Sequence, residues 1–303
     1  MELSFPRYLL AKQSVDDRAL NRVVLADLQD ALATWPTGQA LRVVEVGAGI
    51  GTMLARLLRW NILPPQVEYT LVDEMQENID FARQWLAEWG AQNGFQVESN
   101  PGGLRFAGSK SVLHIRFFKM DVFDFIGTQA ESRYDLLVAH AFLDLLPMPE
   151  SLLSLFQLLK PEGLAWLTVN FDGVTSLEPV LDPALDARIE QLYHQSMDSR
   201  PSGGDSQSGR HLFGHIKQAG AEIVSAGASD WVVYPLKGQY PAEEAYFLRF
   251  ILHFFEISLG GHPQLDAGQF SDWLARRREQ IEQGQLVYIA HQMDFLARKK
   301  QPV

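Results

Sequence analysis

Three glycines stand at alternate positions after an apolar run, and they are the first chemistry-bearing feature of this 303-residue sequence. The run Leu41–Val46 carries Glu45 near its end and is followed by Gly47, Gly49 and Gly51. We expect a strand, a tight turn and a helix that begins near residue 52. In this arrangement the backbone at a helix N-terminus can closely approach a nucleotide-like ligand.

The position of the third glycine separates two kinds of nucleotide site. A dinucleotide fingerprint has glycines at its first, third and sixth positions. Here Thr52 stands at the sixth position and the third glycine is Gly51. No Gly-Lys-Ser/Thr triplet follows the strand, so a P-loop is absent as well. The turn therefore disfavours a pyrophosphate ligand, and with it a dehydrogenase.

Two histidines are candidates for proton transfer. His140 directly follows the apolar run Tyr134–Ala139, so we expect it at the sheet edge where the glycine turn lies. It would act as a base, orient a substrate, or serve as a lining hydrogen-bonding residue. His194, beside Tyr193, is the second candidate. No histidine pair has metal-ligand spacing and the chain has no cysteine, so we expect no metal site.

An α/β sheet would position these residues. Buried apolar runs alternate with segments of helical periodicity, which predicts a doubly wound, mostly parallel sheet. The expected strands are 41–46, 67–72, 112–118, 134–139, 164–169, 222–226 and 285–297, with an extra hairpin between 95 and 106. The segment 172–183 is expected to be a loop.

Helical segments are expected to flank this sheet. Residues 15–34 have the periodicity of one amphipathic helix, with Ser14 as N-cap and Asp16 in the first turn. This helix would cover the sheet edge or act as a lid. Two aromatic-rich helices precede the last strand and would form a cap whose walls suit an apolar or aromatic molecule. A simple cap core, or the interface of a homodimer, would explain the same aromatic residues.

The chain is expected to have three parts, arranged around one sheet. Residues 1–40 form an N-terminal helical lid, and residues 41–170 form the ligand-binding core. Residues 171–303 complete the sheet and include the helical cap at 235–284.

Composition excludes several classes of function. The net charge of −11 argues against general binding of nucleic acid or an anionic membrane. No apolar stretch approaches the roughly 20 residues of a membrane span, and no signal peptide is recognisable. We expect a soluble, cytoplasmic protein.

The sequence resembles the class I S-adenosylmethionine-dependent methyltransferases between Leu41 and Val169. The matching segments, in order, are 44–51, 71–73, 119–122, 134–140 and 159–164. The resemblance implies a seven-stranded Rossmann-like sheet whose last strand is antiparallel, and S-adenosyl-L-methionine as cofactor.

The resemblance also implies a set of cofactor-binding residues. They are Glu45, Gly47, Ala48, Gly49, Gly51, Asp73, Glu74, Asp121, Val122 and His140. Asp73 would accept from the ribose hydroxyls, Asp121 from the adenine amino group, and Val122 would lie against the ring. For Asp73 and Asp121 the alternative is a helix N-cap.

The predicted function is methylation of a small, apolar or aromatic molecule, most simply at oxygen. Nitrogen and carbon acceptors remain open. The alternatives are a cofactor-binding partner or regulatory protein without transferase activity, and an enzyme that methylates protein or nucleic acid.

Overall fold

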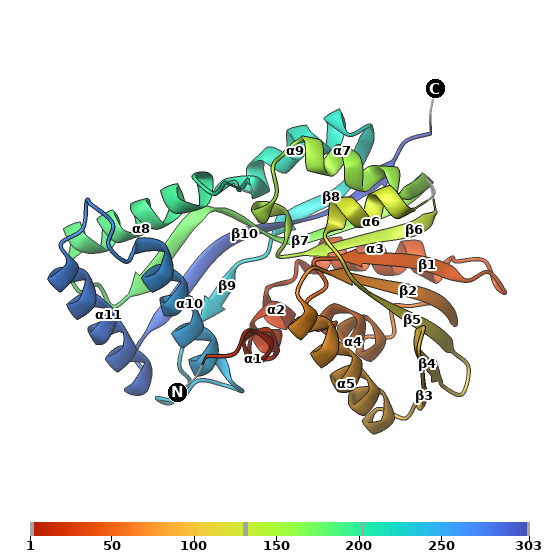
Figure 1. Cartoon of the computed structure of the whole chain (residues 1–303), viewed down its shortest axis with the longest axis horizontal. Coiled ribbons are helices and arrows are strands. Elements are labelled where there is room, and N and C mark those ends of the chain that lie inside the picture. Colours follow the sequence, from red (N-terminus) through yellow and green to blue (C-terminus); the bar gives the residue numbers. More distant parts are fainter. Residues whose placement is uncertain (1–2, 130–132, 202, 302–303) are drawn as a thin grey trace.

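A ten-stranded sheet forms the centre of the computed structural model, which describes residues 3–129, 133–201 and 203–301 (Figure 1). The strands are β1 (Leu41–Val46), β2 (Gln66–Asp73), β3 (Gln96–Asn100), β4 (Gly103–Ala107), β5 (Val112–Lys119), β6 (Tyr134–His140), β7 (Leu159–Glu178), β8 (Ala221–Ala228), β9 (Trp231–Val233) and β10 (Val287–Lys299). Their order is β3-β4-β5-β2-β1-β6-β7-β10-β8, and β9 pairs with β10.

Parallel pairing brings the predicted site residues to one edge of the sheet. Strand β1 pairs in parallel with β2 and β6, and the outer pairs β2–β5 and β6–β7 are also parallel. The carboxyl ends of these strands therefore lie at the same edge. The predicted doubly wound fold is confirmed, with β10 antiparallel to β7 and β8. The seven expected strands lie within a larger sheet, because β3, β4 and β9 add to them.

The helices are α1 (Phe5–Ala11), α2 (Gln13–Ala19), α3 (Arg22–Ala33), α4 (Thr52–Arg59), α5 (Gln76–Gln92), α6 (Val122–Thr128), α7 (Glu150–Gln157), α8 (Pro183–Asp198), α9 (Ser208–Gln218), α10 (Glu244–Leu259) and α11 (Ala267–Glu282), with a short 3-10 helix at Leu143–Leu145. Neighbouring strand residues alternate between two hydrophobic cores: Val43 lies in one and Val44 in the other. This alternation follows from the period of two in a strand and shows that both faces are buried. Among the described helices, none is both long and apolar enough to cross a membrane.

The prediction of one N-terminal helix from residue 15 to 34 was wrong. Two helices, α2 and α3, cover this segment, and the break between them lies at Leu20 and Asn21, whose backbones are extended. Asn21 caps α3, because its side-chain oxygen accepts from the Val23 and Val24 amides at 3.0 and 3.2 Å. Ser14 is not a cap: its hydroxyl donates to Glu244 in α10 at 2.7 Å.

The loop expected at 172–183 is largely strand. Strand β7 continues to Glu178 because β10 supplies a partner, with Leu177 opposite Tyr288 in the antiparallel register. Helices α8, α10 and α11 lie beside this long extension, and α1 lies between them and α5 (Figure 1). The long strands thus place the C-terminal helices across from the glycine turn.

Candidate active site

The glycine turn joins β1 to α4 at the carboxyl edge of the sheet. Gly47, Gly49 and Gly51 have φ of +60°, +54° and +78°, a region that residues with side chains rarely adopt. The Ala48 amide donates to the Val72 carbonyl at 3.0 Å, which holds the turn to β2. The backbone path of this turn therefore depends on its glycines.

Two side chains from other segments lie against the turn. A Cβ added to Gly47 would lie 2.2 Å from the ring of Phe142, and one added to Gly49 would lie 2.8 Å from Leu9 of α1. Both distances are shorter than van der Waals contact, so these neighbours fit only because the turn lacks side chains. The glycines form a cradle, and Leu9 and Phe142 lie in it.

Asp73 ends β2 beside the turn and connects three segments. Its Oδ2 accepts from the Gly49 amide at 2.8 Å, and its Oδ1 accepts from the Met75 amide at 2.9 Å and the Asn78 side-chain amide at 3.0 Å. Burial raises the pKa of Asp73, and the three donors oppose this shift. A carboxylate has about four acceptor positions, so Oδ2 keeps one. Within the described chain, Oδ1 of Asn78 is buried without a hydrogen-bond partner.

Asp121 follows β5, the strand next to β2, and is the N-cap of α6. Its Oδ1 accepts from the Phe123 and Asp124 amides at 2.7 and 3.3 Å. The helix-cap alternative therefore describes its contacts in this structure. At the same edge, Met75 is 41% exposed and Phe123 is 38% exposed. Exposed apolar side chains at two neighbouring strand ends suit contact with a flat ring.

The other predicted cofactor residues differ in burial. Glu45 lies in β1 beneath the turn, is 2% exposed, and accepts the Tyr69 hydroxyl at 2.7 Å. Burial raises the pKa of Glu45 to about 8, although Tyr69 and Arg56 oppose the shift. Val122 is buried, whereas Glu74 is exposed. Glu45 is therefore a protonated core carboxyl at neutral pH.

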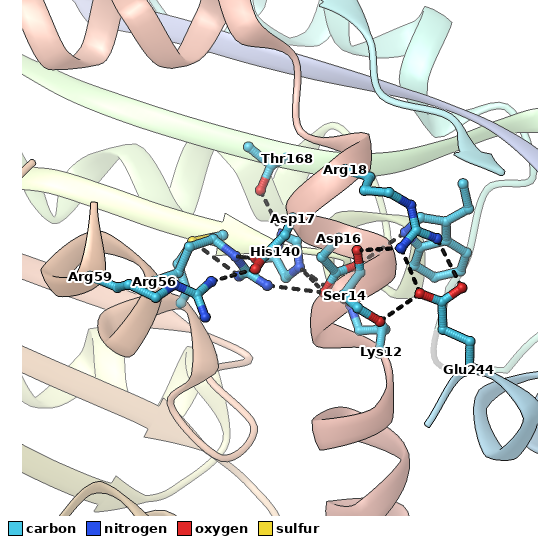
Figure 2. A network of polar contacts seen from close by, with 12 residues as sticks. Lys12, Ser14, Asp16, Asp17, Arg18, Arg56, Arg59, His140, Thr168 and Glu244 are labelled. Carbon is cyan, nitrogen blue, oxygen red and sulfur yellow. Dashed lines mark hydrogen bonds and ion pairs between the residues drawn. The ribbon is translucent and has the colours of Figure 1, made fainter. Parts of the chain in front are cut away.

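Both nitrogens of His140 have partners in the protein (Figure 2). Nδ1 lies 2.8 Å from the Thr168 hydroxyl, and Nε2 lies 2.9 Å from Oδ2 of Asp16 and 3.3 Å from Nζ of Lys12. Burial, together with the neighbouring Lys12 cation, lowers the pKa of His140 to about 4. The neutral ring then donates from Nε2 to Asp16 and accepts from Thr168 at Nδ1. His140 thus ties β6 to the N-terminal helices.

Asp16 is the centre of this network and is only 1% exposed. Besides His140, it contacts Lys12 Nζ at 3.1 Å, the Trp231 indole N–H at 3.0 Å and Arg56 Nη2 at 3.6 Å. Burial opposes ionisation of Asp16, but the Lys12 charge, His140 and Arg56 together hold its pKa below the usual range. The sequence interpretation missed this role, although Lys12 and Asp16 stand four positions apart, a spacing typical of ion pairs.

His194 lies on α8, away from the segment that carries His140. Its Nε2 lies 3.0 Å from the Thr175 hydroxyl of β7, and burial lowers its pKa. Among the described residues, the two histidines share no hydrogen bond and no hydrogen-bonding partner. Within those residues there is also no group of three His, Asp or Glu side chains arranged to hold a metal.

The family model of a methyltransferase domain matches residues 44–165. This segment of the chain is therefore similar to a methyltransferase domain. The matched segment is the one that builds the glycine turn, Asp73, Asp121 and His140.

Two solved structures are similar to this chain at low sequence identity. A methyltransferase candidate from Bacillus halodurans is 14% identical, with 91% of this chain and 99% of that chain covered, at a TM-score of 0.50. A methyltransferase from Thiobacillus denitrificans, solved with S-adenosyl-L-homocysteine, is also 14% identical, with 99% and 100% covered, at a TM-score of 0.48. No curated protein matches the chain.

Proposed function

We propose that this methyltransferase transfers a methyl group to an oxygen of a small molecule with an apolar or aromatic body. The observation that carries the proposal is the aromatic cover that α1 and α10 form over the carboxyl edge. The Tyr8 ring lies 4.5 Å from Phe250, 5.7 Å from Phe247 and 5.5 Å from Phe254. Such a cover suits an apolar acceptor and excludes water from the reacting groups.

We infer that the cofactor binds along the glycine turn and the ends of β2 and β5. The supporting observations are the cradle of glycines, the free acceptor position on Asp73 and the unpartnered amide oxygen of Asn78. The proposed contacts are Glu45, Gly47, Ala48, Gly49, Gly51, Asp73, Glu74, Asp121, Val122 and His140. Asp73 would accept from the ribose hydroxyls, and Asp121 from the adenine amino group while it caps α6.

The N-terminal helices are proposed to act as a lid. Leu9 and Phe142 lie in the glycine cradle, so a ligand that reaches this backbone must displace both side chains. Leu9 belongs to α1, and the adjoining α2 is held by the Asp16 network. Residues 1–40 would therefore open and close over a core at 41–170. The helices within 235–284 would form the fixed side of the cleft.

When bound, S-adenosylmethionine supplies an electrophilic methyl group on a sulfonium. The chain itself therefore needs to bind the cofactor and the acceptor, orient them toward each other and exclude water. An oxygen acceptor also requires removal of its proton. His140 has both nitrogens in protein contacts, and its low pKa makes it a weak base. We therefore assign His140 a positioning role, in which it holds the lid through Asp16. We also assign a positioning role to His194 on α8, because it is hydrogen-bonded to Thr175.

Calorimetry with S-adenosylmethionine tests the cofactor site. Wild-type protein should bind it, and Asp73→Asn should bind at least about tenfold more weakly, because one charge-assisted hydrogen bond is lost. Asp80→Asn, an exposed carboxylate on α5, is the matched control and should bind like wild type. Binding of NAD without binding of S-adenosylmethionine would refute the proposal.

A further inference from the structure

Three buried tyrosines have hydroxyl groups that no part of the described chain satisfies. Tyr8 in α1, Tyr193 in α8 and Tyr288 in β10 are 6%, 8% and 4% exposed. None of the three hydroxyls has a hydrogen-bond partner among the described residues. The three hydroxyl oxygens are not among the fully buried polar atoms of the described chain that lack a partner, so they keep accessible surface at which a ligand can hydrogen-bond.

The three rings are arranged around one helix, α10. Tyr8 and Tyr288 both contact Phe247, with ring centroids 5.7 and 6.1 Å apart. Tyr193 stacks on Phe255, two turns further along α10, at 4.0 Å. Helices α1 and α8 both pack against α10 (Figure 1). Segments that are far apart in sequence thus bring polar phenol groups to one aromatic-walled region.

Asp144 joins this group from the short 3-10 helix Leu143–Leu145 that follows β6. Its carboxylate interacts electrostatically with the Tyr8 and Tyr193 hydroxyls. Burial raises the pKa of Asp144, although the charges of Arg200 and Lys12 oppose the shift. Within the described chain, Asp144 forms no ion pair at bonding distance. Asp144 is therefore a carboxyl group that is not part of a salt bridge within the described chain.

We propose that Tyr8, Tyr193, Tyr288 and Asp144 form the acceptor site, and that its ligand is a neutral molecule with a flat apolar body and a hydroxyl group. This inference rests on the proposed function and names the acceptor side of the same site. The partly accessible tyrosine rings, which Phe247 and Phe255 support from behind, would contact the flat body, and the tyrosine hydroxyls would hydrogen-bond to its polar end.

The charges around the site favour a neutral ligand. Lys12 is paired with Asp16 at 3.1 Å, and the charge of Arg200 interacts with the Asp144 carboxyl group. Positive and negative groups are therefore balanced. A cationic or an anionic ligand would gain no net attraction from this balanced set of charges and would lose its hydration on entering the site. Only a neutral donor hydroxyl adds hydrogen bonds without an unpaired buried charge.

The proton balance gives Asp144 a role in the reaction. As the acceptor oxygen bonds to the methyl group of S-adenosylmethionine, the carbon–sulfur bond breaks and the electron pair stays on sulfur. The hydroxyl proton passes to an Oδ atom of Asp144 and is later released to solvent. The raised pKa of the carboxyl makes it a better proton acceptor than an exposed aspartate.

The first test compares three probes that share one ring system: a naphthol, a naphthoate and a naphthylmethylammonium. Calorimetry is run with S-adenosylhomocysteine present and absent, so that failure of the cofactor site is seen separately from failure of the acceptor site. We expect the naphthol to bind at least about tenfold more tightly than either charged probe. Equal or tighter binding of a charged probe, or no binding of the naphthol, would overturn the proposed ligand class.

The second test removes single oxygen atoms. Tyr193→Phe and Tyr288→Phe should each raise the naphthol Kd by about five- to tenfold, the effect of one hydrogen bond. The Kd of S-adenosylhomocysteine should not change. Tyr234→Phe, at a surface tyrosine that is 45% exposed, is the matched control. Unchanged naphthol affinity in both site variants would overturn the site.

The third test separates binding from proton transfer. Asp144→Asn should lower kcat for methylation of the naphthol by about 100-fold and leave its KM within about threefold of wild type. A loss confined to KM, with kcat unchanged, would refute the role of Asp144 as proton acceptor.

Discussion

Replacement of Glu45 by glutamine should change how stability depends on pH. Burial raises the pKa of Glu45 from 4.5 to about 8. Between these values the folded protein holds a proton that the unfolded chain has released. Unfolding therefore releases a proton in this window, and the contribution of Glu45 to stability falls as pH rises.

The expected magnitude follows from the two pKa values. At about 1.4 kcal/mol per unit, the free energy of unfolding should fall by about 3 kcal/mol between about pH 5 and about pH 7.5 because of Glu45 alone. Glutamine carries no titrating proton and its oxygen still accepts from Tyr69. The advantage of Glu45→Gln over wild type should therefore grow by about 3 kcal/mol across this range.

Urea unfolding at a series of pH values measures this difference directly. His140, whose pKa of about 4 lies below its ordinary value, works in the opposite sense between about pH 4 and pH 6.5, because its folded form binds fewer protons. Its contribution cancels when the variant is subtracted from wild type. Glu68→Gln, at a side chain of β2 that is 33% exposed, is the control. A difference between Glu45→Gln and wild type that does not vary with pH would refute the argument.

Three further substitutions test other parts of the structure. Asp16→Asn should lower the free energy of unfolding, measured in urea, by about 3 kcal/mol, because buried Lys12 and Arg56 lose their counter-charge. Asp17→Asn, at a half-exposed side chain, is the control and should lower it by about 1 kcal/mol. Equal losses in the two variants would contradict this prediction. Asn21→Ala should cost about 1 kcal/mol by thermal unfolding, since it removes the cap of α3, and no loss would show that the cap contributes nothing. Gly47→Ala should abolish binding of S-adenosylmethionine by calorimetry, because the residue has φ of +60° and a Cβ would lie 2.2 Å from Phe142; retained binding would argue against the cradle.

Much of the core fold was predictable because its signals are local. The β-branched run before Gly47 and the apolar run before His140 each specify a buried strand, whatever lies elsewhere in the chain. The extent of β7 was not predictable in the same way. Residues 172–178 became strand because β10 pairs with them, and such a partner lies more than 100 residues away in sequence.

In the N-terminal region the prediction failed although a local signal, the N-cap residue Asn21, was present in the sequence. Helical periodicity runs through residues 15–34, yet the chain breaks at Asn21. Asn21 is a good N-cap in its own right, and its side-chain amide also donates to the Ala228 carbonyl of β8 at 2.9 Å. A contact with a distant strand therefore reinforced a local capping preference that periodicity alone concealed.

By itself, the sequence determined the glycine turn, the acidic residues at the ends of β2 and β5, and the methyltransferase resemblance, because each depends on residue types at short, fixed spacings. Only the tertiary structure brought Lys12, Asp16 and Arg56 around His140, which turned an expected base into a buried link between β6 and the N-terminal helices. The same holds for Tyr8, Tyr193 and Tyr288, which no spacing relates. Burial and mutual proximity set their chemistry, and both are properties of the packed chain.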